Sequence, residues 1–112
     1  MHHMKLHPQP FANIKSGQKT IELRLYDEKR QKIRVGDTIV FTNTATGETL
    51  TVKVQKLHRF SDFTALYRSL PLLNCGYTEE DIAQASPDDM LQYYSLEQQA
   101  QYGVVGIEII CL

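Results

Sequence analysis

The sequence predicts an α+β chain: a small, partly open β-barrel with antiparallel or mixed strands, short helices and an acidic helical insert. Three observations predict this. Short β-branched and aliphatic segments alternate with turn residues through the first half of the chain. The composition turns helical after Phe60, and a nearly continuous apolar run over 104–110 suits a central closing strand. Several strands with few helices in 112 residues favour a small barrel.

The first half is expected to contain one short helix among four strands. A strand over Lys5 to His7 should end at Pro8 and Pro10. A helix over 11–16 should follow, because Pro10 suits a first helical turn and Gly17 suits a left-handed stop. The remaining expected segments are a strand over 20–26, a charged loop over 27–32, a turn over 35–37, a strand over 38–41, a turn at 46–47 and a strand over 49–55.

The second half is expected to be helical until the closing strand. Ser61 can cap a helix over 62–68, which the pair at 70–71 should end. Ser86 precedes a proline and two acidic residues, which indicates a helix start. The expected segments are helices over 62–68, 78–85, 87 to 93 or 94, and 96–101, the last capped by Ser95, then the strand over 104–110.

The overall composition indicates one soluble domain over 1–112. Hydrophobic residues make up 42% and charged residues 22% of the chain, as in ordinary globular proteins. No apolar run approaches the roughly 18 residues of a membrane span, and no secretory leader is visible at the start, so we expect a cytoplasmic protein without a membrane partner. Cys75 and Cys111 lack a CxxC spacing and are expected to be reduced.

The strand over 20–26 carries an unusual set of charges. Side chains alternate across a strand, so Ile21, Leu23 and Leu25 should face the core. The opposite face then presents four polar side chains beside Lys19: Thr20, Glu22, Arg24 and Tyr26. If this face lines a concavity, it is a candidate functional site. If it faces bulk water, it is a solvated strand surface, and the sequence leaves both interpretations open.

Three blocks of the chain resemble the ASCH domain, which has a PUA-like β-barrel. They are residues 14–24 (IKSGQKTIELR), 33–41 (IRVGDTIVF) and 102–109 (YGVVGIEI). PUA-like barrels commonly bind RNA or a modified base in a cleft beside the barrel. The resemblance therefore implies binding of RNA or a nucleotide-like ligand, and implies no cofactor.

The resemblance also implies an alternative, a small hydrolase. A bacterial branch of the family hydrolyses N4-acetylcytidine with a lysine, a threonine and a glutamate, and other members have been assigned ribonuclease activity. Lys19 matches the lysine, and Thr20 matches a neighbouring threonine. Glu22 stands where that branch has its nucleophilic threonine, and the third residue has no match. In this alternative Lys19 and Glu22 would form the catalytic acid–base pair.

The candidate ligand-binding residues each have a second, structural interpretation. Lys19 could hold a phosphate, act as a base or be a solvated surface lysine, and Arg24 could contact a ligand or simply pair with Glu22. A basic loop, which holds Lys29, Arg30, Lys32 and Arg34, could contact phosphates or only be solvated. Tyr26 and Phe41 could stack on a base or belong to the core. The expected set is Lys19, Thr20, Glu22, Arg24, Tyr26, Lys29 and Arg30.

Charge is divided unevenly along the chain. Residues 1–68 hold all 12 Lys and Arg, whereas residues 69–112 hold none and are acidic. This asymmetry suggests either an anion-facing surface or two halves that neutralise each other across the fold. The insert holds the acidic residues Glu79, Glu80, Asp81, Asp88 and Asp89. It could form a wall that favours a short ligand, or it could provide a surface that binds another protein. His2, His3 and His7 have no carboxylate or thiol at ligand spacing, so we expect no metal site.

Overall fold

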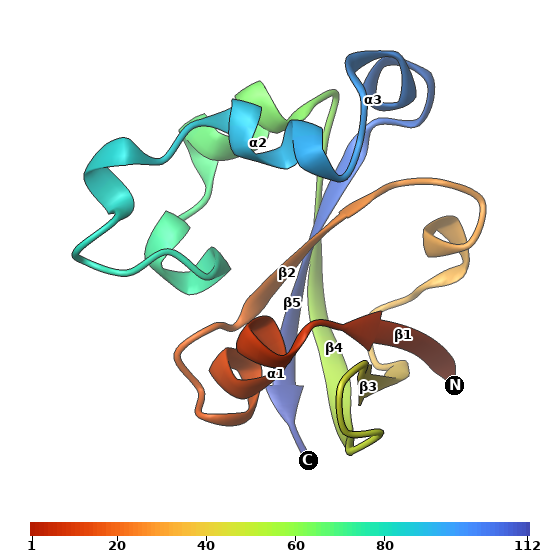
Figure 1. Cartoon of the computed structure of the whole chain (residues 1–112). Coiled ribbons are helices and arrows are strands. Elements are labelled where there is room, and N and C mark those ends of the chain that lie inside the picture. Colours follow the sequence, from red (N-terminus) through yellow and green to blue (C-terminus); the bar gives the residue numbers. More distant parts are fainter.

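Five strands form one mixed sheet that curls into a half-barrel (Figure 1). The computed structural model describes residues 1–112. The strands are β1 (His2–Leu6), β2 (Ile21–Leu25), β3 (Thr38–Asn43), β4 (Thr49–Phe60) and β5 (Val104–Cys111). Their order is β1-β3-β4-β5-β2, with β1 parallel to β3 and every other neighbour antiparallel. The α+β class and the mixed, partly open barrel are therefore confirmed.

Helices lie at two places around the sheet. Helix α1 (Pro8–Lys15) packs beside the lower end of the strands in Figure 1, and α2 (Phe63–Ser69) and α3 (Leu96–Tyr102) lie above. We call residues 61–102, which hold α2, α3 and three 3₁₀ segments, the insert. The 3₁₀ segments of the chain are Arg30–Lys32, Leu72–Cys75, Ile82–Gln84 and Pro87–Gln92. None of the helices has the length and apolar character needed to traverse a bilayer.

Two hydrophobic clusters form the core, and strand β5 contributes residues to both. The larger cluster fills the half-barrel and includes Phe11, Ile39 and Phe41. The smaller one lies between the sheet and the insert, and contains Ile21, Leu23 and Leu25, as the alternation predicted. Because both faces of β2 are covered, any polar side chain on this strand is forced into a largely dehydrated position.

The N-terminal elements begin earlier than predicted. The expected strand over 5–7 is β1 over His2–Leu6, and the expected helix over 11–16 begins at Pro8. Pro8 and Pro10 both fall in the first turn of α1, where a missing N–H removes no intrahelical hydrogen bond. His2 pairs with Ile39 of β3, and its ring nitrogen lies 2.9 Å from Asp37, so this end is part of the sheet.

Most predicted boundaries in the insert need small corrections. Asp62, not Ser61, caps α2, because its carboxylate accepts from the Ala65 N–H at 2.9 Å. The segments expected over 78–85 and after Ser86 are only short 3₁₀ turns. Ser86 and Ser95 form the expected N-terminal caps. Strand β4 continues five residues past 55, because it pairs with β5 again after a bulge.

Candidate functional site

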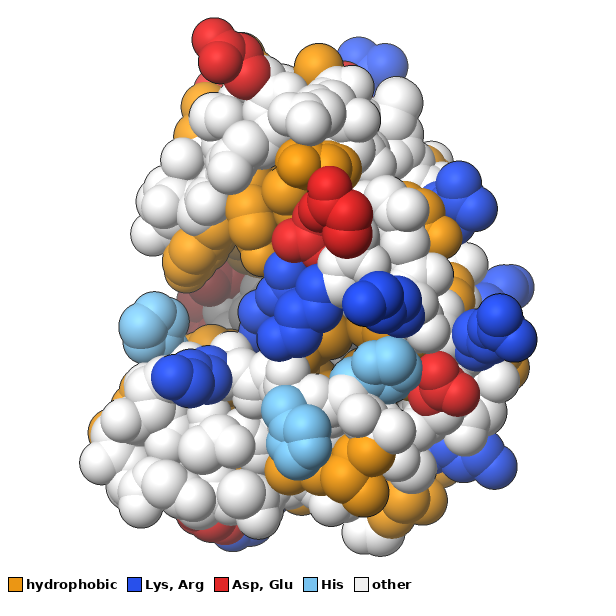
Figure 2. Space-filling view, turned by 90° about the vertical axis from the view of Figure 1, so that its right-hand side faces the viewer, with side chains coloured by type: hydrophobic (Ala, Val, Ile, Leu, Met, Phe, Trp, Pro, Cys, Tyr) orange, Lys and Arg blue, Asp and Glu red, His pale blue; other side chains and the backbone are white.

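A cleft of about 510 Å³ opens between the two edge strands of the half-barrel and the insert. Strands β1 and β2 end the sheet on either side, so no backbone ladder joins them. The Arg24 guanidinium spans this gap instead, donating from Nη2 to the Lys5 carbonyl at 2.9 Å. Figure 2 shows a hollow at one edge of this face, with hydrophobic side chains above it and histidine and Lys or Arg side chains below it.

Three charged side chains meet on the floor of the cleft. Lys19 Nζ lies 2.7 Å from Glu22 Oε1, and Arg24 Nε lies 2.7 Å from Glu22 Oε2. The side chains of Lys19, Glu22 and Arg24 are only 11%, 5% and 14% exposed. The charged face of β2 thus lies in a concavity and not in bulk water, and both carboxylate oxygens are occupied by cations.

The two cations keep Glu22 ionised despite its burial. Burial alone would raise the pKa of Glu22, but the charges and hydrogen bonds of Lys19 and Arg24 outweigh it and hold the pKa below its ordinary value. Burial opposes the charged form of Arg24 too, yet the neighbouring Glu22 and the Tyr94 hydroxyl keep the pKa of Arg24 raised. The group therefore carries two positive charges and one negative charge, a net +1.

Local backbone contacts fix the position of Lys19. Gly17 ends α1 with a φ of 86°, a conformation that favours glycine. The Lys19 N–H then donates to the Asn13 carbonyl at 3.0 Å. Gly76 of the insert, at φ +113°, closes over the lysine: a Cβ there would lie 3.4 Å from Lys19 Cδ. The turn and the insert together hold the lysine against Glu22.

Tyrosines of the insert form the wall that faces the charged floor. Tyr67, Tyr77, Tyr93 and Tyr94 all line the cleft. The Phe63 and Tyr94 rings stack with centroids 6.1 Å apart, and the Tyr93 ring lies 6.5 Å from that of Tyr94. Sequence reasoning missed this wall. A usable signal was present, since five of the six tyrosines of the chain follow Phe60.

The wall also contains a chain of hydrogen bonds and a thiol. The Tyr67 and Tyr77 hydroxyls are 2.7 Å apart, and Tyr77 donates to Asp89 Oδ2 at 2.7 Å. Burial raises the pKa of both tyrosines, and the hydrogen bond to Asp89 raises that of Tyr77 further. Burial also raises the pKa of the Cys75 thiol to about 11. Cys75 is therefore not an activated nucleophile.

Four residues of the predicted site lie outside the cleft. Thr20 borders a second hollow of about 350 Å³, near the contact between His58 and Glu108. Tyr26 packs against the half-barrel core, with the Arg59 guanidinium 4.5 Å from its ring centroid. Lys29 is exposed, and Arg30 pairs with Asp27 at 2.8 Å. The structure brings together Lys19, Glu22 and Arg24 and leaves out Thr20, Tyr26, Lys29 and Arg30.

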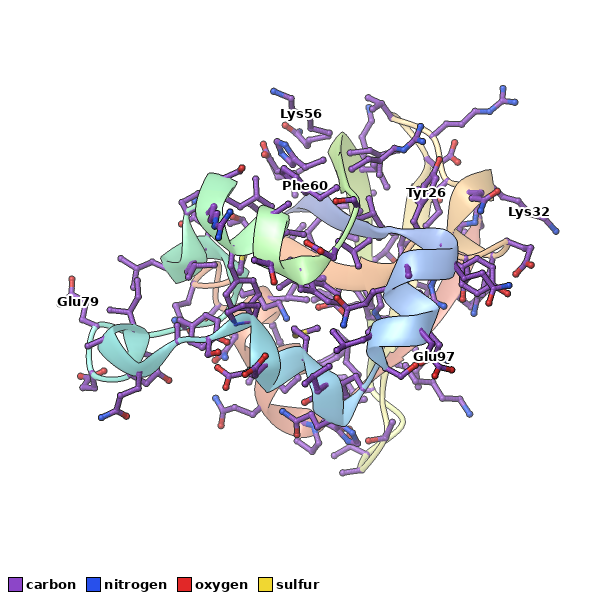
Figure 3. All side chains as sticks on the ribbon, turned by 90° about the horizontal axis from the view of Figure 1, so that it is seen from above. Tyr26, Lys32, Lys56, Phe60, Glu79 and Glu97 are labelled. Atoms are coloured by element: carbon purple, nitrogen blue, oxygen red, sulfur yellow. The ribbon has the colours of Figure 1, made fainter.

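One acidic part of the insert lies far from the basic loop. Figure 3 shows Lys32 and Glu79 at opposite ends of the molecule, so these two charges do not neutralise each other by contact. Two acidic residues of the insert, Asp81 and Asp89, line the cleft. The cleft thus has a cationic floor and an acidic, aromatic wall. No group of three or more potential metal ligands comes together in the structure.

Comparisons with known proteins give the chain a family. The ASCH domain model matches residues 4–111. The crystal structure of the hypothetical protein PH0355 is 35% identical, with 98% of this chain and 97% of that chain covered and a TM-score of 0.81. The solution structure of PF0455 from Pyrococcus furiosus is 32% identical, with 99% and 96% covered and a TM-score of 0.76.

A more distant structure shares the fold. The ASCH protein from Zymomonas mobilis is 14% identical, with 96% of this chain and 65% of that chain covered and a TM-score of 0.64. A search among curated proteins found no match. The family match spans almost the whole chain, and the half-barrel agrees with it. The chain therefore belongs to the ASCH domain family, whose members are thought to bind RNA.

Proposed function

We propose that this protein binds a nucleotide in the cleft, either as one unit of an RNA strand or as a free nucleotide-like ligand. The observation that carries the proposal is the buried group of Lys19, Glu22 and Arg24, which leaves a net positive charge on the floor of a cleft walled by tyrosines. Family membership supports the same class of ligand.

The floor is suited to an anionic or acceptor group of the ligand. An ammonium has three donors and a guanidinium has five, so Lys19 and Arg24 retain donors beyond those given to Glu22 and the Lys5 carbonyl. Charge-assisted hydrogen bonds of this kind favour phosphate. Because Glu22 holds both cations in place, little side-chain order has to be gained on binding.

The wall is suited to a base. Tyr93 and Tyr94 offer ring faces, and stacking of a base on an aromatic side chain contributes about 1–3 kcal/mol. A volume of about 510 Å³ is in the range of small-molecule sites. Asp81 and Asp89 repel further phosphates on that side. An RNA strand would therefore leave the cleft on the side away from Asp81 and Asp89, and the exposed Lys29 could contact one of its phosphates.

Binding can be tested with short fluorescein-labelled single-stranded RNA and with nucleoside monophosphates at two salt concentrations. Lys19→Ala should weaken binding at least tenfold, because it removes one floor cation from the ligand while Arg24 still compensates the charge of Glu22. Lys15→Ala is the matched control, since Lys15 pairs with Glu48 outside the cleft. Equal affinity of native protein and Lys19→Ala would overturn the proposal, as would the absence of binding to every probe.

One observation favours hydrolysis as a second candidate function. Lys19 and Glu22 are in direct contact at 2.7 Å, as an acid–base pair would be. Against it, a Glu22 pKa held low makes the carboxylate a weak base, and the Cys75 thiol is not activated. Incubation with N4-acetylcytidine and with short RNA tests this directly. Turnover by native protein that Lys19→Ala abolishes would establish the hydrolase, and no turnover would leave binding alone.

A further inference from the structure

The hydrogen-bond chain in the wall of the cleft begins at a backbone amide. The Ser86 N–H donates to Asp89 Oδ2 at 3.2 Å, and the Tyr77 hydroxyl donates to the same oxygen at 2.7 Å. The Tyr67 hydroxyl lies 2.7 Å from that of Tyr77. Tyr67, Tyr77 and Asp89 all line the cleft, so the far end of this chain faces the space where a ligand would bind.

The direction of every hydrogen bond in this chain follows from its donors. A backbone N–H can only donate, which fixes Asp89 Oδ2 as an acceptor. Tyr77 has one hydroxyl proton and gives it to Asp89, so Tyr67 has to donate its own proton to Tyr77. The raised pKa values of both tyrosines keep these protons in place at neutral pH. Only lone pairs remain on Tyr67 Oη.

We infer that Tyr67 is a specificity-determining residue that accepts a hydrogen bond from a donor group of the bound ligand. Tyr77 and Asp89 are positioning residues, because they act only by fixing the proton of Tyr67. The floor opposite offers donors from Lys19 and Arg24. The preferred ligand therefore has an anionic or acceptor group at one end and an N–H or O–H donor at the other. This inference rests on the proposed function.

The monophosphates of adenosine and cytidine have three donors of the required kind: the exocyclic amino group of the base, the 2′-hydroxyl and the 3′-hydroxyl of the ribose. Calorimetric titration of the native protein with matched pairs separates them. Adenosine against purine riboside monophosphate, and cytidine against pyrimidin-2-one riboside monophosphate, remove the amino group without adding another donor. Ribose against 2′-deoxyribose forms, and ribose against 3′-deoxyribose forms, each remove one hydroxyl. We expect one kind of pair to show about fivefold tighter binding of the donor-bearing member, the equivalent of one net hydrogen bond.

Two single-hydroxyl deletions test Tyr67 itself. Tyr67→Phe should bring the affinity ratio of the discriminated pair close to one, because the acceptor is gone while the ring remains. Tyr102→Phe deletes a hydroxyl outside the cleft and should leave the ratio at its native value. An effect of Tyr67→Phe on packing alone would weaken both members of a pair equally, so the ratio isolates the hydrogen bond.

Variants of the two positioning residues test the direction of the hydrogen bonds from Tyr67 to Tyr77 and Asp89. Tyr77→Phe and Asp89→Ala each free the Tyr67 proton to point into the cleft, so the preference should shrink although Tyr67 is still present. Asp89→Asn keeps an oxygen that accepts from Ser86 and Tyr77, and should retain the native ratio. If asparagine at position 89 retains the affinity ratio and alanine does not, the effect comes from the direction of the Tyr67 hydroxyl proton. Circular dichroism of each variant shows whether the fold is intact.

The outcomes separate this inference from the proposed function. If the native protein binds nucleotides but no pair differs, or if Tyr67→Phe leaves the ratio unchanged, the role of Tyr67 is wrong while the nucleotide site stands. If the native protein binds none of the nucleotides and no short RNA, both are wrong. We expect the native protein to discriminate between the members of one pair. Tyr67→Phe and Asp89→Ala should abolish this affinity ratio, and Asp89→Asn should retain it.

Discussion

Two hollows border strand β2, and each contains a carboxylate paired with a nitrogen-bearing side chain at nearly the same distance. In the cleft, Glu22 lies 2.7 Å from Lys19 and 2.7 Å from Arg24. In the second hollow, Glu108 lies 2.9 Å from His58. The side chain of Glu22 is 5% exposed, whereas that of Glu108 is 39% exposed. Contact distance alone would rank the two sites as equals.

Burial separates the two sites. Removing one partner of a buried ion pair leaves an uncompensated charge in a poorly solvated place, which is strongly unfavourable. Removing one partner of an exposed pair leaves a charge that water and salt can screen. In the cleft each charge therefore depends on its partners for compensation, whereas in the second hollow solvent can compensate the charge. Substitutions of Glu22 and Glu108 therefore test whether burial decides what each carboxylate contributes to stability.

The largest effect is expected from Glu22→Gln. The variant leaves the Lys19 and Arg24 cations buried together without their counter-charge, and we expect a loss of about 3–5 kcal/mol in the free energy of unfolding. Urea denaturation followed by circular dichroism measures it, and the slope of the transition should stay unchanged. A loss below about 1 kcal/mol would show that water reaches these cations and that the floor is not a dehydrated site.

The pH dependence of stability should carry the signature of Glu22. Its pKa in the folded protein is lower than the ordinary value of 4.5, so the ionised carboxylate stabilises the fold above pH 4.5. That contribution is lost as the pH falls through the lower folded value. Urea denaturation of native protein and Glu22→Gln between pH 7 and pH 3 should therefore give curves that converge on acidification.

A second carboxylate makes the comparison with the variant necessary. A hydrogen bond from His2 holds the pKa of Asp37 below its usual range, so acid also weakens that contact in both proteins. Only the difference between the two curves belongs to Glu22. Curves that stay parallel down to pH 3 would contradict the lowered pKa of Glu22 in the folded state.

The sequence predicted those elements that depend on neighbouring residues and missed boundaries that depend on pairing with distant strands. The central strand over 104–110 and the caps at Ser86 and Ser95 depend on neighbouring residues and were found. The start of β1 at His2 depends on pairing with β3, more than thirty residues away, and was missed. The continuation of β4 to Phe60 likewise depends on β5 beyond a bulge. Tertiary pairing overrides local propensity at such places.

The candidate site shows the same division. Glu22 and Arg24 lie two residues apart on one strand, so strand alternation is enough to predict that they share a face, with Lys19 at the entrance of the strand. Thr20 belonged to the same alternation but precedes β2 and lies at the second hollow. The tyrosine wall could not be placed, because Tyr67, Tyr77 and Asp89 approach Lys19 only after the insert folds back over the half-barrel. Residues that come together from distant segments form no sequence motif with a fixed spacing, so the sequence alone does not place them in one site.

An intermediate effect is expected from Arg24→Lys. Lysine keeps the positive charge beside Glu22, but it lacks the fork with which the guanidinium contacts both Glu22 and the Lys5 carbonyl. We expect a loss of about 1–2 kcal/mol in unfolding free energy, close to one or two net hydrogen bonds. Amide hydrogen exchange should accelerate in β1, the strand that this side chain ties to β2. Native stability and native exchange in β1 would show that the edges do not need this bridge.

The smallest effect is expected from Glu108→Gln in the second hollow. Because Glu108 is 39% exposed and its single partner is His58, we expect a change within about 0.5 kcal/mol in unfolding free energy at low salt. Raising the ionic strength to 0.5 M should abolish that small change by screening, while the loss caused by Glu22→Gln should persist because salt does not enter the cleft floor. Parallel urea titrations at both salt concentrations measure this. Equal losses for Glu108→Gln and Glu22→Gln, or equal salt sensitivity, would mean that contact distance and not burial decides what a carboxylate contributes in this fold.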